Sequence, residues 1–274
     1  MFAAVGCGGS GCNMAERLSA LSDADIFTVN TDHRSLIRSR SGERILIGNV
    51  EGCSGNVKKG RSCAMRARKL IREKLRPYSD VVIMTGLGGG TGTGSLPVIA
   101  KMAKKNGSNV ISVVTLPLSF EKERRETARD ALKIIHKFSD SVIILDGSRI
   151  ETIDPGLSVD ETLRALNEMA CVSAVRMMSM SWNGKGMFTV GVAEHTEPTE
   201  SAMISYENLM FDHSYTIPEG TILYLEGILR STDRGEVKET CASIGFEPQM
   251  VCERTQSKKA VTVMFTPVSD RIFG

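Results

Sequence analysis

The sequence predicts an α/β protein whose first part is a doubly wound parallel sheet. Short apolar segments rich in β-branched residues alternate with helical segments over residues 1–154, as in proteins of that architecture. Two glycine-rich segments each join a strand to a helix, at the carboxyl edge where such sheets bind ligands. A long central helix is expected over residues 155–182, and a smaller α/β domain over residues 183–274.

The expected elements follow one another with short connections. In the first domain we expect strands at residues 1–5, 26–29, 80–84, 110–116 and 141–145, and helices at 14–22, 57–76, 95–102 and 123–138. After the central helix we expect strands at 187–193, 221–229, 248–254 and 260–266, and helices at 200–211 and 233–243.

The composition is that of an ordinary globular protein. Hydrophobic residues make up 41% of the 274 positions and charged residues 24%, and the net charge of +2 gives no indication of nucleic-acid binding. No apolar run approaches the roughly 18 residues of a membrane span, and no signal peptide precedes the first strand, so we expect a cytoplasmic protein. The seven cysteines form no Cys-x-x-Cys pair, which predicts reduced thiols and no metal site.

The segment from Gly86 to Gly94 has the composition of a phosphate-binding loop. Its glycines let the backbone approach a ligand closely, Thr91 and Thr93 add hydroxyl donors, and the next helix directs its first amides toward the segment. It is not a P-loop, because no Lys follows the last glycine. A flexible turn is the alternative, although such connections usually need only about 2 to 6 residues.

A second glycine-rich segment follows the first strand. Gly6, Gly8 and Gly11 satisfy Gly-x-Gly-x-x-Gly, and Asp32 lies about 20 positions further on, as in dinucleotide-binding folds. Taken alone, this half supports an NAD-dependent oxidoreductase and another kind of nucleotide site almost equally. The segment from Gly86 to Gly94 disfavours the oxidoreductase, since a dinucleotide fold has no use for a second phosphate cradle.

These motifs together resemble those of the tubulin/FtsZ family. The segment from Gly86 to Gly94 matches the family's signature loop residue for residue, and the first loop ending in Asn13 and the Asn30-Thr31-Asp32 sequence are also similar. The resemblance implies a cytoskeletal or cell-division protein that binds GTP or GDP, with Mg²⁺ as a candidate companion ion. It assigns nucleotide contacts to these positions: Gly8, Gly9, Ser10, Asn13, Asn30, Asp32, Ser54, Gly55, Gly88, Gly89, Gly90, Thr91, Gly92, Thr93, Gly94, Pro117, Glu121, Arg125, Leu163 and Asn167.

Some of these roles are more specific. The resemblance places Ser54 and Gly55 in the loop that senses the terminal phosphate. It places Glu121 at the ribose and Arg125 near the nucleotide, roles that suit a carboxylate acceptor and a guanidinium. The alternative for this pair is the charged start of a solvent-facing helix.

On the central helix, Leu163 and Asn167 have the spacing with which the family packs an apolar residue on guanine and bonds the guanine edge one turn later. A surface polar residue is the alternative for Asn167. After the strand at 141–145 the chain departs from the family pattern, because Gly147 and Ser148 stand where the family has Asn and Asp.

The largest departure follows the central helix. FtsZ proteins carry an Asn-x-Asp-x-x-Asp loop and a further helix there, whereas Trp182 and Asn183 lead almost directly into the next strand. No catalytic residue is assigned, since activating water needs a carboxylate within reach. We expect weak or absent self-catalysed GTP hydrolysis, and association with itself or with FtsZ. The alternatives are a non-polymerising GTP/GDP sensor and, remotely, the NAD-dependent oxidoreductase.

The expected helix at residues 57–76 is strongly basic. It carries nine Lys and Arg residues and one acid, Glu73. Such a run is most often a solvated face, and a docking surface for an acidic partner or polymer is the alternative. Because no aromatic residues are interleaved, it is not typical of an RNA-binding module.

Overall fold

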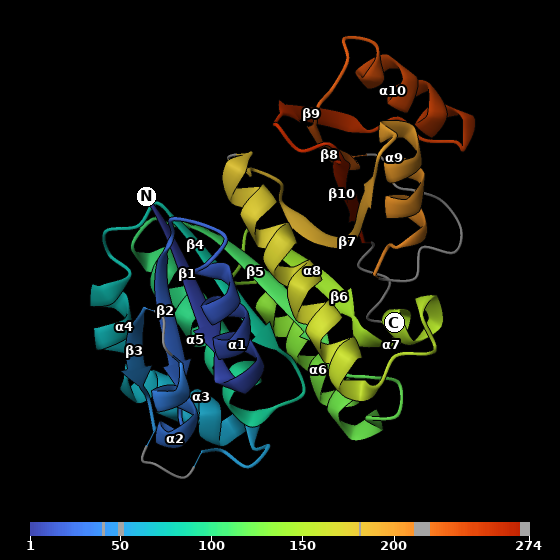
Figure 1. The fold of residues 1–274 in the computed structure, drawn as a ribbon. Helices are drawn as coiled ribbons and strands as arrows, with labels where there is room; N and C mark the ends of the chain where they lie inside the picture. The colour runs from blue at the N-terminus through green and yellow to red at the C-terminus, as the bar shows by residue number, and fades with distance from the viewer. Residues whose placement is uncertain (40–41, 49–51, 181, 211–219, 269–274) are drawn as a thin grey trace.

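A computed structural model describes residues 1–39, 42–48, 52–180, 182–210 and 220–268 (Figure 1). Within them, the strands form one ten-stranded sheet in the order β3-β2-β1-β4-β5-β6-β7-β10-β8-β9. The strands are β1 Phe2–Cys7, β2 Asp25–Asn30, β3 Glu43–Leu46, β4 Asp80–Gly86, β5 Asn109–Leu116, β6 Ser141–Asp146, β7 Gly186–His195, β8 Ile222–Gly227, β9 Gln249–Arg254 and β10 Ala260–Pro267.

The first half of the sheet is doubly wound, as predicted. From β1 the chain proceeds outward to β2 and β3, and then returns to the other side of β1 with β4, β5 and β6, all in parallel pairs. The order reverses between β1 and β4, which is where such sheets bind ligands at the carboxyl ends of their strands. The α/β fold class is therefore confirmed.

Helices cover both faces of this sheet. They are α1 Gly8–Leu18, α2 His33–Arg38, α3 Val57–Arg66, α4 Arg68–Lys74, α5 Gly90–Lys105, α6 Lys122–Ile135, α7 Gly147–Ile153, α8 Val159–Ser179, α9 Pro198–Glu207 and α10 Asp233–Ser243. Buried residues of α3, α4, α5 and α6 share one hydrophobic cluster, and those of α1, α7 and α8 share another across the sheet. In Figure 1, α1 and α8 lie in front of the strands.

The central helix α8 is shorter than predicted, because it begins at a defined cap. The Ser158 side chain accepts a hydrogen bond from the Glu161 amide, and the Glu161 carboxylate accepts one from the Ser158 amide. This capping box satisfies donors that the helix start leaves unpaired. The Ser-x-x-Glu sequence was a legible signal for it. Ser181, near the predicted end, lies outside the described residues.

Short elements escaped the sequence analysis. β3 buries one of its four residues, Ile45, so it has little apolar signal. The six-residue helix α2 is capped by Asp32, and α7 by Asp146, each through an amide two residues on. The predicted helix at 57–76 is divided at Ala67, where ψ is 1°.

The C-terminal strands extend the same sheet. β7 pairs with β6 in parallel, and β10 then pairs antiparallel with both β7 and β8. This part has its own hydrophobic cluster, formed with residues of α9 and α10 such as Ala202 and Val237. The division of the chain at residues 154 and 182 stays a prediction. Phe211, at the predicted end of α9, lies outside the described residues.

Two further properties concern the whole described chain. Within it, no helix combines the length and apolar character needed to cross a bilayer. The cysteines are unpaired, and all are buried except Cys252. Burial raises the pKa of the Cys12 thiol to about 11, which keeps that thiol protonated and unreactive at neutral pH.

Candidate functional site

A cleft of about 540 Å³ opens at the carboxyl edge of the sheet. Its walls are the start of α1, the ends of β4 and β5, the β5–α6 connection and the first turns of α8. It brings together seven of the residues predicted from the sequence: Gly9, Ser10, Asn13, Pro117, Glu121, Leu163 and Asn167. These residues span more than half of the chain, so the fold joins motifs that are remote in the sequence.

The starts of α1 and α5 lie side by side at this edge. A Cβ atom added at Gly8 would lie 3.0 Å from the Gly92 amide nitrogen. Within the described residues neither helix has a side-chain cap or an acidic residue in its first turn. An added Cβ would meet nothing within 4 Å at Gly9 or Gly89 in that same part of the chain. Unpaired first-turn amides beside open space form a suitable environment for an anion.

Other glycines of the predicted phosphate loop serve close packing. The helix α5 begins at Gly90, so the second half of the predicted loop is helical. A Cβ atom at Gly94 would lie 2.4 Å from the Val57 carbonyl oxygen, and one at Gly90 would lie 2.7 Å from the Asn56 amide nitrogen. Gly92 is similarly tight against Thr85. These three glycines let α5 lie against α3 and the β4 end.

The Asn30-Thr31-Asp32 loop is held by its own side chains. The Asn30 Oδ1 atom accepts hydrogen bonds from the Thr31 and Asp32 amides, at 2.8 and 3.2 Å. The Thr31 hydroxyl lies 2.6 Å from the Thr91 hydroxyl and joins this loop to the start of α5. The Ser35 hydroxyl and the Arg34 amide hold the pKa of Asp32 below its usual range. Asn30 and Asp32 thus shape the loop, and their nucleotide contacts stay predictions.

In the β5–α6 connection the structure distinguishes two adjacent arginines. Arg125 forms a two-pronged ion pair with Asp146 at 2.7 and 2.8 Å, and donates to the Pro117 carbonyl at 2.6 Å. Hydrogen bonding to Asp146 raises the pKa of Arg125. Arg124, which the sequence analysis did not select, lines the cleft and donates to Glu121. The guanidinium in the cleft wall is therefore that of Arg124.

The glutamate of this connection lies in the cleft wall, and its contact with a ribose stays a prediction. Glu121 lines the cleft, and its Oε2 atom accepts a hydrogen bond from the Leu118 amide at 3.0 Å. This bond orients the carboxylate while leaving acceptor positions open toward the cleft, since an ionised carboxylate has about four.

Leu163 and Asn167 lie one turn apart on the cleft side of α8. The Leu163 side chain is 41% exposed, and Phe120 and Val159 are exposed apolar residues in the same cleft. Asn167 accepts a hydrogen bond from the Ser10 hydroxyl at 3.4 Å, which connects α8 to the start of α1. Phe120 and Val159, which were not among the residues predicted from the sequence, add apolar surface suited to a flat ring. Val159 could have been found from the sequence, because it is an apolar residue one helical turn before Leu163.

The loop predicted to sense a terminal phosphate lies beside the start of α5. Ser54 and Gly55 both adopt positive φ angles, of 44° and 78°. A Cβ atom added at Gly90 would lie 2.9 Å from the Gly55 carbonyl carbon. The loop is thus adjacent to the uncapped helix start rather than in the wall of the 540 Å³ cleft.

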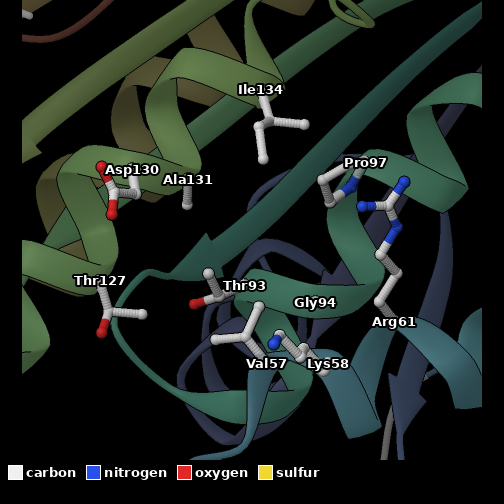
Figure 2. A pocket seen from close by; sticks show the side chains of 10 residues that line it. All are labelled: Val57, Lys58, Arg61, Thr93, Gly94, Pro97, Thr127, Asp130, Ala131 and Ile134. Carbon is white, nitrogen blue, oxygen red and sulfur yellow. The ribbon is translucent and has the colours of Figure 1, made fainter.

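A second pocket lies on the other side of α5 (Figure 2). It measures about 260 Å³ and is enclosed by α3, α5 and α6. Thr93 and Gly94 line this pocket together with Lys58 and Arg61, and Figure 2 shows the Thr93 side chain directed toward α6. Contacts of Thr93 and Gly94 with a nucleotide therefore stay predictions, and the main cleft does not include either residue.

Comparison with known proteins identifies the family. The model of the GTPase domain of the tubulin/FtsZ family matches residues 2–154. The chain belongs to the tubulin/FtsZ family. The cell division protein FtsZ 1 of Pyrococcus abyssi is 38% identical over 179 residues, which cover 63% of this chain and 48% of that protein. FtsZ 1 of Pyrococcus woesei is 30% identical over 250 residues, covering 81% of this chain and 68% of that protein. The chain spans about half the length of the first of these curated relatives.

Solved structures of the family have the same fold. An FtsZ dimer from M. jannaschii superposes with a TM-score of 0.86 at 24% identity, covering 98% of this chain and 88% of the other. CetZ2 from Haloferax volcanii, solved as a GTPγS-bound protofilament, has a TM-score of 0.84 at 18% identity, covering 99% of this chain and 95% of the other. At such identities the likeness establishes the tubulin/FtsZ fold and nothing finer.

Proposed function

We propose that this chain is a cytoskeletal GTP- and GDP-binding protein that holds the guanine nucleotide in the 540 Å³ cleft. The observation that carries the proposal is the convergence in one cleft of the α1 start, the Glu121 connection and the Leu163–Asn167 pair. The three regions offer an anion site, a carboxylate and an apolar wall with an amide. A nucleotide needs these groups for its phosphates, its ribose and its base.

Each part of the nucleotide has suitable partners in this arrangement. The open space at Gly9 and Gly89, beside two uncapped helix starts, suits the phosphates. Glu121, held by the Leu118 amide, suits the two ribose hydroxyls. Leu163 and Phe120 offer exposed apolar surface for the base, and Asn167 offers an amide for its edge. The amide can both donate and accept, as guanine recognition requires.

The described residues offer no cluster of ligands that could hold Mg²⁺ by themselves. Among the residues that the structure describes, no group of three or more His, Cys, Asp or Glu side chains could hold a metal ion. Mg²⁺ often binds nucleotide proteins mainly through substrate phosphates and water. We propose that any Mg²⁺ here would depend on the phosphates in the same way.

We further propose that the chain alone hydrolyses GTP slowly. Residues 180–185 join α8 to β7, and this segment contains no Asp or Glu. Positioning an attacking water needs a general base or an orienting group within hydrogen-bond reach. A subunit of this kind could accept a neighbour's acidic loop at its own nucleotide but could not offer one, which fits co-assembly with an FtsZ or capping of its filaments.

The test begins with the nucleotide that the protein carries. The purified protein is denatured and the released nucleotide is identified chromatographically, and GTP turnover is then measured at rising protein concentration. We expect bound guanine nucleotide and negligible turnover that does not rise with concentration. An Asn167→Ala preparation serves as a control, because contaminating GTPase activity would persist in it unchanged.

Three outcomes would contradict parts of the proposal. Release of an adenine or nicotinamide nucleotide would reject guanine binding. Turnover that rises steeply with concentration would reject slow hydrolysis, since subunits would then complete one another's sites. Sedimentation of a monomer with both GTP and GDP, with no effect on the polymerisation of an added FtsZ, would favour a nucleotide sensor over a filament component.

A further inference from the structure

One segment of this protein carries a large excess of positive charge. Between Val57 and Arg76 lie nine Lys and Arg residues and one acid, so this stretch carries +8 while the whole chain carries +2. The rest of the chain is therefore net negative by six charges. The segment forms the helices α3 and α4, on the opposite face of the sheet from α8.

In the part of the chain that the structure describes, most of these cations lack an acidic partner. Within the described residues, Lys74 pairs with Glu43 at 2.7 Å, and it is the one cation of the segment in an ion pair there. Arg66 and Arg68 donate instead to neutral groups of their own helix region, the Ser62 hydroxyl and the Met65 carbonyl. An ordinary solvated helix face carries positive and negative residues in alternation. This surface has few acidic residues, so its positive potential is not compensated.

Apolar side chains lie among the cations. Met65 is 42% exposed and Leu70 is 43% exposed. Other apolar residues of this segment, Ile71 and Leu75, are buried and make its contacts with the core. Met65 and Leu70 thus remain well exposed beside this packing, and they add apolar area to a cationic surface.

A notch of about 370 Å³ lies at the end of this surface, lined by Lys69, Arg72, Glu73, Arg76 and Asn106. The Arg72 guanidinium donates to Asn106 Oδ1 at 3.2 Å, and the Asn106 amide donates to the Arg72 carbonyl at 2.8 Å. This mutual bonding fixes one guanidinium between α4 and the end of α5. Arg72, fixed in this way beside Lys69 and Arg76, suits a phosphate group, because a fixed side chain loses less conformational entropy on binding than a mobile one.

We propose that the outer surface of α3 and α4 is a peripheral membrane-binding face for bilayers containing anionic lipids. Clusters of four to eight cations on a helix are attracted to acidic headgroups, each contributing on the order of 1 kcal/mol near the surface. Exposed apolar side chains can be buried at the boundary between lipid headgroups and acyl chains. Nucleic acid and acidic polypeptides offer no comparable apolar layer. This contribution of Met65 and Leu70 favours the lipid surface over those polymers.

The location is compatible with nucleotide binding. The cleft is formed by α1, α8 and the carboxyl ends of the strands, whereas α3 and α4 belong to the helical layer across the sheet. Figure 1 shows α4 at the outer margin of the sheet, away from α8. A protein docked through α3 and α4 would leave the cleft edge free, so this inference does not depend on the proposed nucleotide.

The experiment is co-sedimentation with phospholipid vesicles at low and moderate salt. We expect binding to vesicles of phosphatidylcholine with about 30% phosphatidylglycerol, no binding to phosphatidylcholine alone, and weakening as salt rises. The triple variant Lys69→Gln, Arg72→Gln, Arg76→Gln should bind about 100-fold more weakly. The matched control, Lys185→Gln, Lys238→Gln, Lys258→Gln, removes the same charge from the C-terminal part and should bind within about threefold of wild type.

A second arm tests the apolar contribution without changing the charge. Met65→Ser with Leu70→Ser should weaken vesicle binding about tenfold and leave binding to polyglutamate or single-stranded DNA unchanged. Circular dichroism and thermal unfolding confirm that each variant is folded. The proposal is overturned if wild type fails to bind the anionic vesicles, if both triple variants lose binding equally, or if the serine variant binds vesicles as well as wild type does.

Discussion

The two ends of α8 are held in opposite ways. At the N-terminal end, Leu163 is 41% exposed, and Asn167 contacts α1 through one long hydrogen bond of 3.4 Å from Ser10. At the C-terminal end, Arg176 donates to Glu226, and its guanidinium lies 5.4 Å from the centre of the Tyr224 ring. The Tyr224 hydroxyl lies within hydrogen-bonding distance of both Glu226 and Glu253, and it can donate its single proton to either carboxylate.

This difference shows how one helix can serve two purposes. The cleft end exposes the apolar Leu163 and binds Asn167 through one long hydrogen bond, as the proposed ligand site requires. At the far end, the Arg176–Glu226 ion pair joins α8 to β8, and the Tyr224–Glu253 contact joins β8 to β9. We therefore expect changes at the far end to alter folding stability, and changes at the cleft end to alter nucleotide affinity.

The largest effect is expected from Arg176→Met. Both partners of the Arg176–Glu226 pair are mostly buried, with side chains 22% and 10% exposed, so the variant leaves an uncompensated carboxylate. We expect a loss of about 3 kcal/mol in the free energy of unfolding, measured by urea denaturation. Nucleotide affinity of the folded protein should not change.

A double variant sharpens this test. Adding Glu226→Leu to Arg176→Met removes the stranded charge, and we expect at least half of the lost stability to return. No recovery would mean that the packing of Arg176 on Tyr224, rather than the charge pair, holds this end of α8.

At the cleft end we expect Asn167→Ala to weaken guanine nucleotide binding about tenfold, because one hydrogen-bonding group to the base is lost. The free energy of unfolding should change by less than about 0.5 kcal/mol. Arg164→Ala, on the same part of α8 but outside the cleft wall, is the matched control. An equal loss of affinity in both variants would show a general perturbation of the helix instead of a base contact.

The third prediction concerns pH. Burial and the hydrogen bond with Glu253 raise the pKa of Tyr224 above its usual value near 10. The unfolded chain therefore loses this proton first, and the stability that neutral Tyr224 contributes is present below pH 10 and is lost as pH rises above it. Tyr224→Phe should cost about 1 kcal/mol at pH 7, and its deficit relative to wild type should shrink above pH 10. A deficit that stays constant up to pH 11 would contradict this.

The smallest effect is expected midway along α8. Arg17 and Glu168 form an ion pair whose side chains are 54% and 39% exposed. Exposed pairs contribute about 0.2 to 1 kcal/mol, so Arg17→Ala should reduce the free energy of unfolding by about 0.5 kcal/mol, measured by urea denaturation. A loss as large as that of Arg176→Met would mean that burial does not explain the difference between the two pairs.

The sequence predicted the cleft end of α8 better than the far end, and for physical reasons. Leu163 and Asn167 lie one helical turn apart, so their shared face follows from local periodicity and from family resemblance. Arg176, Glu226 and Glu253 come together only through the pairing of remote strands, and no local pattern encodes that. Arg124 was missed for a similar reason, because only Asp146 on β6 determines which of the two adjacent arginines turns away from the cleft.

The glycine-rich segment shows the same limit. Its composition predicted close approach of the backbone to a ligand, whereas Gly90 and Gly94 approach α3 and Gly89 faces open space. Which glycine is near protein and which is near solvent depends on how α3 and α5 pack, which the segment itself does not reveal.

The most direct test of the central claim is an equilibrium titration of nucleotide-free protein with a fluorescent GDP analogue, displaced by GDP and by ADP. We predict saturable binding of one molecule of the analogue per chain, and displacement of the analogue by GDP at least 100-fold more effectively than by ADP. Asn167→Ala should lose most of this preference. Equal displacement by ADP, or a preference that survives Asn167→Ala unchanged, would contradict the placement of guanine against α8.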